Sequence, residues 1–260
     1  MKSEYQVQEV IAAMQEIAPF ELACDWDHVG LMIGDAGSAV KKVLLALDIT
    51  KDAVDMAVAQ EANLIVTHHP MFFTPINKID YSTPQGRNIR TLIQHDITVF
   101  AAHTNLDKAS QGVNQALAEK LDLVMPVLLQ GIEVGICGSV GGESTMLFKY
   151  AEMVKEKLGA SGLLFNTDRD REVSRVFLQG GAFDESVIPI LKDYRVDAVV
   201  TGEMKHHQML ELEDAGIAAI VAGHEVTERI VLPSLEKQLL HKLPNLPIAI
   251  YEGHKWQKNI

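Results

Sequence analysis

Short and almost wholly apolar runs recur along this chain and alternate with stretches whose apolar residues have helical spacing. In the first half, the apolar runs are residues 41–49 (KKVLLALDI), 63–67 (NLIVT) and 97–102 (ITVFAA). A β-prone run without a polar face is typical of a strand that is buried on both sides of its sheet. The helical stretches lie at Val7–Met14, after Thr50, near 86–95 and over 112–121. This alternation predicts an α/β fold with largely parallel or mixed sheets.

The second half of the chain repeats the same order of elements. Apolar runs at 173–178, 198–201 and 217–222 alternate with helical stretches at 184–192 and 203–214. We interpret this as an internal duplication, with one α/β repeat over 1–125 and a second over 126–260 that intertwine and act as one unit. The alternative is that any α/β chain aligns with itself in this way.

A glycine-rich segment lies at residues 131–143 (GIEVGICGSVGGE). Phosphate-binding loops end in Gly-Lys-Ser or Gly-Lys-Thr, and this segment does not. We therefore predict a turn between two strands at this point.

The charge balance disfavours anionic partners. Of 260 residues, 35 are acidic and 23 are basic, which gives a formal net charge of −12 at pH 7. Nucleic acids and anionic membranes attract positive surfaces, so neither is an expected partner. No apolar run reaches the ~18 residues of a membrane-spanning helix, and the N-terminal residues do not resemble a signal peptide. Cys24 and Cys137 form no disulfide framework, and we expect a cytoplasmic protein.

Polar side chains with metal-binding chemistry follow the predicted strands. The crevice beyond the carboxyl ends of parallel strands is where open α/β sheets bind ligands. Each histidine there could instead be a half-buried side chain with ordinary hydrogen bonds, but their recurrence at strand ends favours a site. The residues are His68 and His69 after the run 63–67, His103 after 97–102, His224 after 217–222, and Asp107 and Glu228, each four residues beyond a histidine.

Neutral imidazole and carboxylate are ligands that Zn²⁺, Fe²⁺ and Mn²⁺ accept in proteins. Neighbouring side chains near an extended strand point apart, so we expect His68 and His69 to reach two different ions. Two ions bridged by a carboxylate activate a shared water molecule, which makes that water the expected nucleophile. The predicted ligands of this dinuclear site are His68, His69, Asp107, His224 and Glu228, with His103 a sixth candidate.

Five motifs in order resemble one known family, the GTP cyclohydrolase I type 2 homologues, also called the Ngg-interacting-factor-3-like family. The resemblance covers most of the chain, from residue 26 to residue 228. The motifs are Trp26-Asp27-His28-Val29-Gly30-Leu31; Thr67-His68-His69-Pro70; His103-Thr104-Asn105-Leu106-Asp107 with Gly112-Val113-Asn114; Thr201-Gly202-Glu203 with His206-His207; and Gly223-His224 ending in Glu228.

The resemblance implies a duplicated α/β fold, a toroidal homohexamer and a dinuclear metal site on the five ligands named above. His103 either binds a metal ion or contacts a residue that does. Glu203 is a second candidate for a residue that contacts a metal ligand. Longer members carry an inserted domain, and this sequence looks like the short form. It departs from the family pattern at His28, where asparagine is usual, and at Glu225, where tyrosine is common.

Two readings of function remain open at this point. In the first, the protein is a metal-dependent hydrolase, and the family name implies GTP as a substrate whose purine ring is opened by water. In the second, it is a non-catalytic, metal-stabilised ring that binds a partner and regulates it. His206 and His207 could contact an anionic substrate or simply face solvent. A DNA-binding ring is disfavoured by the negative charge.

Overall fold

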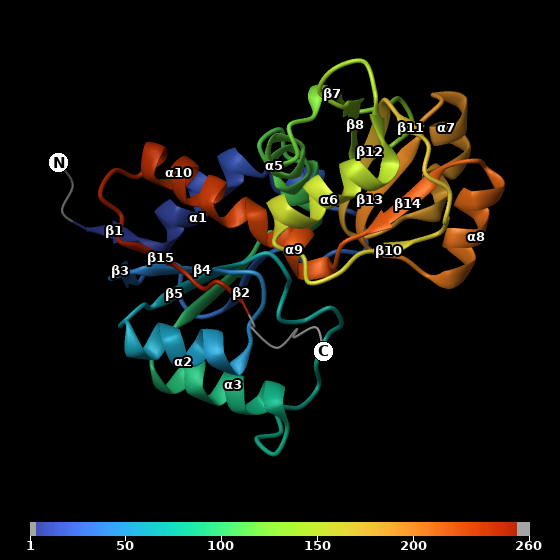
Figure 1. Cartoon of the computed structure of the whole chain (residues 1–260). Helices are drawn as coiled ribbons and strands as arrows, with labels where there is room; N and C mark the ends of the chain where they lie inside the picture. Colours follow the sequence, from blue (N-terminus) through green and yellow to red (C-terminus); the bar gives the residue numbers. More distant parts are fainter. Residues whose placement is uncertain (1–3, 254–260) are drawn as a thin grey trace. The chain divides into compact units, whose positions relative to one another are not determined.

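The computed structural model describes residues 4–253, which form two units, each built around its own β-sheet (Figure 1). The first unit comprises residues 4–109 and 232–253, and the second comprises 110–231. This division differs from the expected boundary at residue 125. Residues 232–253 belong to the first unit because β15 (Ile248–Ile250) pairs in parallel with β4 (Val43–Ala46).

The first unit contains a five-stranded sheet in the order β15-β4-β5-β6-β2. The three predicted runs form β4, β5 and β6, which are parallel neighbours, whereas β2 runs antiparallel to β6. Thr67 at the end of β5 pairs with Ala46 of β4 and Ala101 of β6. The residues that follow these strands therefore emerge at one edge of the sheet. The other strands of this sheet are β2 (Gly30–Ile33), β5 (Leu64–Thr67) and β6 (Thr98–Ala101).

Helices cover both faces of this first sheet (Figure 1). On one face, Val54 of α2 and Leu92 of α3 share a buried cluster with Ile65 of β5. On the other face, α10 contacts both β4 and α1. Thr50 caps α2 as its position predicts, because its hydroxyl accepts a hydrogen bond from the Ala53 amide at 3.1 Å. The helices are α1 (Val7–Ile17), α2 (Lys51–Ala59), α3 (Pro84–Gln94), α4 (Thr104–Lys108) and α10 (Leu232–Lys242).

The second unit contains a six-stranded sheet in the order β10-β14-β13-β12-β8-β7. Its centre is parallel, because β12, β13 and β14 pair in that sense, while β10, β8 and β7 are antiparallel to their neighbours. The register of β12 against β13 shifts between Gln179 and Ala182. The strands are β7 (Val124–Val127), β8 (Ile136–Ser139), β10 (Leu164–Phe165), β12 (Arg175–Ala182), β13 (Ala198–Glu203) and β14 (Ala218–Val221).

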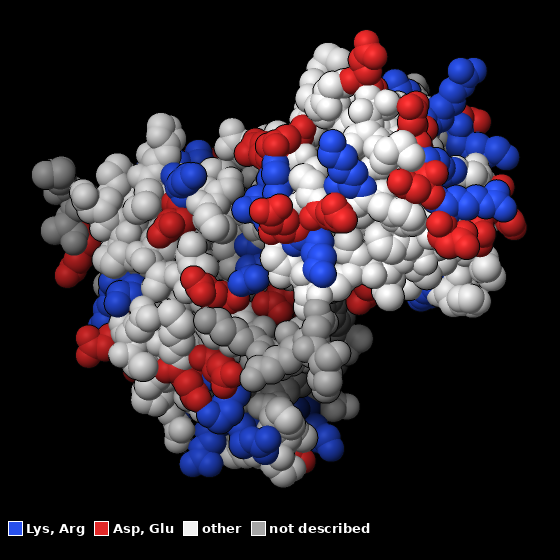
Figure 2. All heavy atoms as spheres, in the orientation of Figure 1, with Lys and Arg blue, Asp and Glu red and all other residues white. Residues whose placement is uncertain are grey.

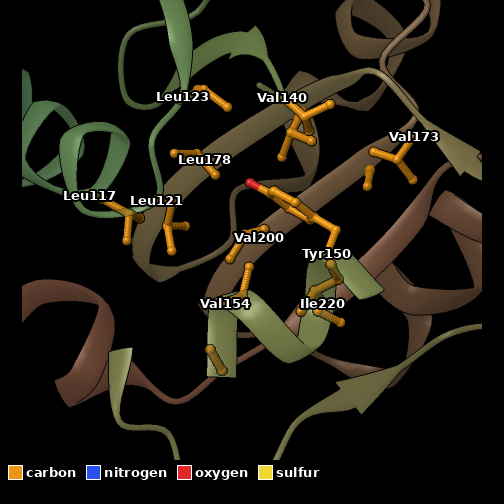
Figure 3. Close-up of a cluster of buried hydrophobic side chains, with 14 of the residues drawn as sticks. Leu117, Leu121, Leu123, Val140, Tyr150, Val154, Val173, Leu178, Val200 and Ile220 are labelled. Carbon is orange, nitrogen blue, oxygen red and sulfur yellow. The ribbon is translucent and has the colours of Figure 1, made fainter. Parts of the chain in front are cut away.

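Successive residues of the central strands in this sheet serve two different cores. Val176 and Leu178 of β12 pack with α5 and α6, whereas Phe177 between them packs with α7 and α8. Side chains alternate across a strand, so each face needs its own helical layer. Figure 3 shows the first of these cores, with the ring of Tyr150 among aliphatic side chains. The helices are α5 (Val113–Lys120), α6 (Leu147–Leu158), α7 (Ile188–Asp193), α8 (His206–Asp214) and α9 (His224–Glu228).

The glycine-rich segment 131–143 is more than a turn, and the prediction was wrong for residues 136–139. These residues form β8, an inner strand between β12 and β7. Glycine serves the packing there, because a Cβ on Gly138 would lie 2.7 Å from Cγ of Leu123. A glycine within a strand often marks such a close approach.

Short elements complete the described part of the chain. Two small antiparallel ribbons are formed by β1 with β3 and by β9 with β11. The bounds are β1 (Tyr5–Gln6), β3 (Ala39–Val40), β9 (Thr145–Met146), β11 (Glu172–Val173), η1 (Phe20–Leu22), η2 (Glu185–Val187) and η3 (Arg229–Val231).

The predicted α/β class with mixed parallel and antiparallel sheets is confirmed. Within residues 4–253, none of the helices combines the length and the apolar character needed to cross a membrane. On the face drawn in Figure 2, Lys and Arg side chains are interspersed with Asp and Glu side chains.

Candidate metal centre

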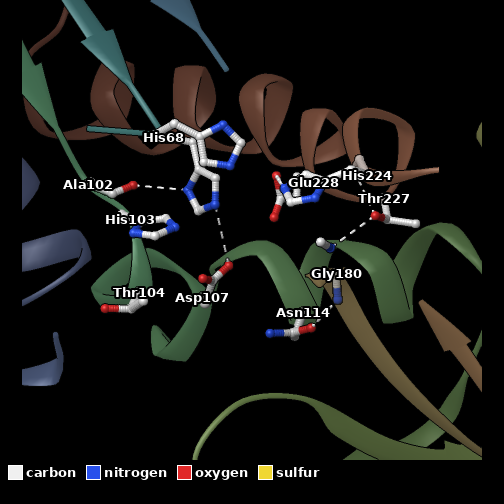
Figure 4. Close-up of polar contacts among 12 residues, drawn as sticks. His68, Ala102, His103, Thr104, Asp107, Asn114, Gly180, His224, Thr227 and Glu228 are labelled. Carbon is white, nitrogen blue, oxygen red and sulfur yellow. Dashed lines mark hydrogen bonds and ion pairs between the residues drawn. The ribbon is translucent and has the colours of Figure 1, made fainter. Parts of the chain in front are cut away.

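Three histidines of the first unit gather where β5 and β6 end. His68 and His69 directly follow β5, and His103 lies two residues beyond β6. Each ring offers one nitrogen to a common point, since these three nitrogens all lie within 4.8 Å of one another. The ring centroids are 4.9 to 5.5 Å apart. Figure 4 shows His68 and His103 at this edge of the sheet.

The arrangement of His68 and His69 differs from the expectation that they point apart. That expectation assumed that the strand continues through both residues. However, β5 ends at Thr67, so the alternation of side chains no longer holds beyond it. The rings of His68, His69 and His103 lie close enough to hold an ion together, and the expectation that His68 and His69 serve two different ions stays a prediction.

Each of the three rings is fixed through its Nδ1 atom. The acceptors are a backbone carbonyl oxygen and two carboxylate oxygens, which do not donate, so Nδ1 carries the proton. Nε2 is then the nitrogen that each ring can offer to an ion, and metal-binding imidazoles are commonly held in this way. The pairs are His68 with the Ala102 carbonyl at 3.0 Å, His69 with Oδ1 of Asp48 at 2.8 Å, and His103 with Oδ1 of Asp27 at 3.0 Å.

Asp27 is the most heavily used of these acceptors. Its Oδ2 accepts hydrogen bonds from the Thr104 amide at 3.0 Å and the Thr104 hydroxyl at 2.5 Å. Its side chain is 1% exposed. Burial alone would raise the pKa of this carboxyl, but the hydrogen bonds from His103 and Thr104 outweigh it and hold the pKa well below its usual range. Asp27 therefore remains an anion that fixes both His103 and the start of α4.

Asp107 lies one helical turn beyond His103. The first turn of α4 begins at His103, and the Asp107 amide donates to the His103 carbonyl at 3.0 Å. This turn brings Oδ1 of Asp107 to 3.6 Å from Nε2 of His68, as Figure 4 shows. The His-x-x-x-Asp spacing thus places the carboxylate beside the ring nitrogen that could bind an ion.

The second unit carries the other two predicted ligands on one short helix. Nε2 of His224 lies 3.0 Å from Oε2 of Glu228, four residues later on α9. Nδ1 of the same ring lies 3.4 Å from Oε2 of Glu203, the last residue of β13. Glu203 thus lies behind His224, where we expect a residue that orients a ligand. Glu228 is 3% exposed, so its carboxyl group is buried next to an imidazole.

Glycines make room for this helix. A Cβ on Gly181 would lie 2.0 Å from Oε1 of Glu228, and one on Gly202 would lie 2.6 Å from Oγ1 of Thr227. The hydroxyl of Thr227 also accepts a hydrogen bond from the Gly181 amide at 3.1 Å. Gly181 has a φ of +68° at the register shift in β12, a conformation that glycine adopts readily. The last residues of α9 therefore pack directly on the backbone of β12 and β13.

A buried asparagine on α5 binds the backbone of Gly180, the residue before Gly181 in β12. Oδ1 of Asn114 accepts a hydrogen bond from the Gly180 amide at 3.0 Å, which Figure 4 shows as a dashed line. Gly180 and Gly181 were missed in the sequence, and so were the roles of Asp27 and Asp48. A Gly-Gly pair inside an otherwise apolar strand was the available indication.

Other residues marked in the sequence have local partners. Nε2 of His207 lies 2.9 Å from Oε2 of Glu185, and its side chain is 60% exposed. His206 begins α8 and is also exposed. Glu225 lies 3.6 Å from Arg229, the first residue of η3, four positions later. These contacts give His207 and Glu225 ordinary surface partners.

The chain matches known proteins over most of its length. Residues 5–255 match the family described as Duf34/NIF3 (NGG1p interacting factor 3). A protein of Clostridium acetobutylicum named "GTP cyclohydrolase 1 type 2 homolog" is 32% identical over 263 residues, covering 96% of both chains. A protein of Streptomyces coelicolor with the same name is 34% identical over 233 residues, covering 86% of this chain and 81% of the relative.

Solved structures show the same fold. A Bacillus cereus protein related to NIF3 matches with a TM-score of 0.89 and 23% identity over 98% of both chains. A Staphylococcus aureus hypothetical protein, SA1388, matches with a TM-score of 0.90 and 24% identity over 98% of this chain and 99% of its own. The resemblance seen in the motifs is thus confirmed, and the chain belongs to the Duf34/NIF3 (NGG1p interacting factor 3) family.

Proposed function

We propose that this protein is a divalent-metal-dependent hydrolase with two ions per chain. The observation that carries the metal site is the orientation of His68, His69 and His103, whose Nδ1 atoms all bond to oxygen acceptors. Three such rings with their offered nitrogens within 4.8 Å of one another fit an ion better than they fit a hydrophobic core.

The proposed ligands are the five from the sequence motifs. The motifs in both units support this shared set, and within each unit the donors lie close to one another. Imidazoles and carboxylates without thiolates suit Zn²⁺, Fe²⁺ or Mn²⁺. The ligands are His68, His69, Asp107, His224 and Glu228, with His103 beside them.

Divalent ions at such a site supply Lewis-acid activation of water and neutralise negative charge that develops on a substrate. The protein's own residues set the geometry for this chemistry. Asp27 and Asp48 keep the Nδ1 protons of His103 and His69 in place, so these rings cannot rotate away. Glu203 lies 3.4 Å from Nδ1 of His224, a position from which its carboxylate favours one orientation of that ring.

The names of the relatives support GTP or another purine nucleotide as the substrate, opened by water. The resemblance supports a homohexameric ring. The isolated cysteines and the acidic composition support a cytoplasmic location.

Metal analysis of the full chain tests the site. Protein purified without chelators and reloaded with Zn²⁺ or Mn²⁺ should hold close to two ions per chain by plasma emission spectrometry. His68→Ala should lose at least one ion. His95→Ala is the matched control, because His95 is an exposed histidine at the end of α3 and should keep both. A wild-type value near zero, or full retention in His68→Ala, would overturn the site.

A nucleotide panel tests hydrolysis. Metal-loaded protein should release a ring-opened product from GTP, and His68→Ala should lose this turnover while keeping its oligomeric state. Absence of turnover from metal-loaded protein, together with loss of the oligomer on chelation, would favour a non-catalytic ring instead.

A further inference from the structure

A cavity of about 570 Å³ lies within the first unit beside His69. It is bounded by the loop after β4, the first turns of α2, the loop after β5 and one face of α3. This is the carboxyl edge of the parallel strands, where α/β sheets bind ligands, and the volume is typical of a small-molecule site. His69 and its acceptor Asp48 form part of the wall, so the cavity borders the candidate metal centre.

Most of the titratable side chains that line this cavity have an ionisable partner, and the Arg87 guanidinium is the exception among the described residues. Asp48 faces His69, and Asp55 is paired with Lys51 on α2. Arg87 on α3 donates through Nη1 to the carbonyl of Ser82. Within residues 4–253, no carboxylate lies within ion-pair distance of the Arg87 guanidinium. Its positive charge is therefore available to a ligand, and a guanidinium fork suits phosphate or carboxylate.

The rest of the wall offers flat and apolar contacts. Phe73 lines the cavity and is 56% exposed, although it is a large hydrophobic residue. Its ring centroid lies 6.5 Å from that of His69 and 5.7 Å from that of His103. Met71 also lines the cavity, beside Phe73. Such side chains bury the face of an unsaturated ring.

We propose that this cavity binds a small organic anion that carries an unsaturated ring. The anionic group pairs with Arg87, the ring packs against Phe73 and Met71, and the reacting end reaches His69. This inference rests on the proposed function for the chemistry at that end, and it adds the cavity that receives the substrate and the side chains that bind its ring and its anionic group. Arg87 acts in binding and is not a metal ligand.

Calorimetric titration of the zinc-loaded full chain tests the inference with three probes. Guanosine 5′-monophosphate carries a ring and a phosphate, orotate carries a ring and a carboxylate, and guanosine carries a ring alone. For whichever anionic probe binds the wild-type protein, Arg87→Ala should lower the affinity by about tenfold or more. Arg87→Lys should recover part of that affinity, and guanosine should respond to neither change. Whichever anion binds identifies the anionic group as phosphate or carboxylate.

Arg90→Ala is the matched control, since Arg90 lies on the same helix with its guanidinium 5.2 Å from the ring centroid of Tyr81 and outside the cavity wall. It should leave every affinity within about twofold. If neither anion binds zinc-loaded protein, or if Arg87→Ala and Arg90→Ala act alike, the inference is wrong while the metal site stands. If the protein holds no zinc, the proposed function fails first and the inference with it.

Discussion

Replacing Gly181 with alanine should damage the candidate metal centre as well as the backbone. Gly181 has a φ of +68°, and its Cβ would lie 2.0 Å from Oε1 of Glu228 and 3.3 Å from Nε2 of His224. The Glu228 carboxylate must move, and its 3.0 Å contact with His224 is then lost. The substitution thus combines left-handed strain with displacement of a buried charged group.

Gly159 provides the matched control. It has nearly the same φ, +65°, at the end of α6, and a Cβ there would meet nothing within 4 Å. Gly159→Ala should therefore show the strain alone, about 1 kcal/mol of unfolding free energy. Gly181→Ala should cost that amount plus about 1–3 kcal/mol for disrupting a buried carboxylate.

Urea denaturation followed by circular dichroism measures the two free energies, and competition with a chromogenic chelator measures zinc affinity. We expect Gly159→Ala to keep the wild-type affinity and Gly181→Ala to lose at least about tenfold. If the two variants matched in both stability and zinc affinity, the close packing of Glu228 on Gly181 would play no part in the site.

Three further outcomes follow from the structure. Tyr150→Phe should leave the unfolding free energy unchanged or raise it by about 1 kcal/mol, because among the described residues its buried hydroxyl has no hydrogen-bond partner; a clear loss in urea denaturation would show a hidden partner. Burial raises the pKa of Tyr150 above its usual 10.0, so the folded state holds the phenol proton to a higher pH than the unfolded state does. The resulting stabilisation is complete below pH 10.0, and the unfolding free energy should fall as the pH rises above that value. Tyr150→Phe should not show this fall. Asp27→Ala should lower zinc affinity by at least about tenfold and the unfolding free energy by about 3 kcal/mol. Asp25→Ala removes the same charge from an exposed side chain and should change neither quantity. Equal effects of the two substitutions would show that Asp27 does not orient His103.

The inner strands were predictable because burial on both faces leaves a strong pattern. The run 63–67 became β5, and 198–201 became the first part of β13. Edge strands lack that pattern. β2 exposes Leu31, and β15 is separated by about 200 residues from its partner β4, so neither pairing is visible in local sequence.

The candidate ligands were predictable because strand ends meet at one edge of a sheet. The atoms that orient them were not, since the choice of Asp27 for His103 depends on a loop that joins residues 76 positions apart. Asp48 could have been predicted from the same pattern of polar residues at strand ends. It lies two residues beyond the end of β4, just as His103 lies two residues beyond the end of β6. The common direction of His68 and His69 depends on where β5 stops, which composition does not reveal.

The path of the chain has a consequence for synthesis on the ribosome. β4 emerges early, but its neighbour β15 is made only after the whole second unit. At ~5–20 residues per second, the roughly 200 residues between β4 and β15 take about 10–40 s to translate. Throughout that interval the nascent first sheet exposes an apolar strand edge, which is a template for aggregation. Nascent chains arrested before residue 248 should therefore depend on chaperones, while the contiguous second unit can complete its own sheet before translation ends.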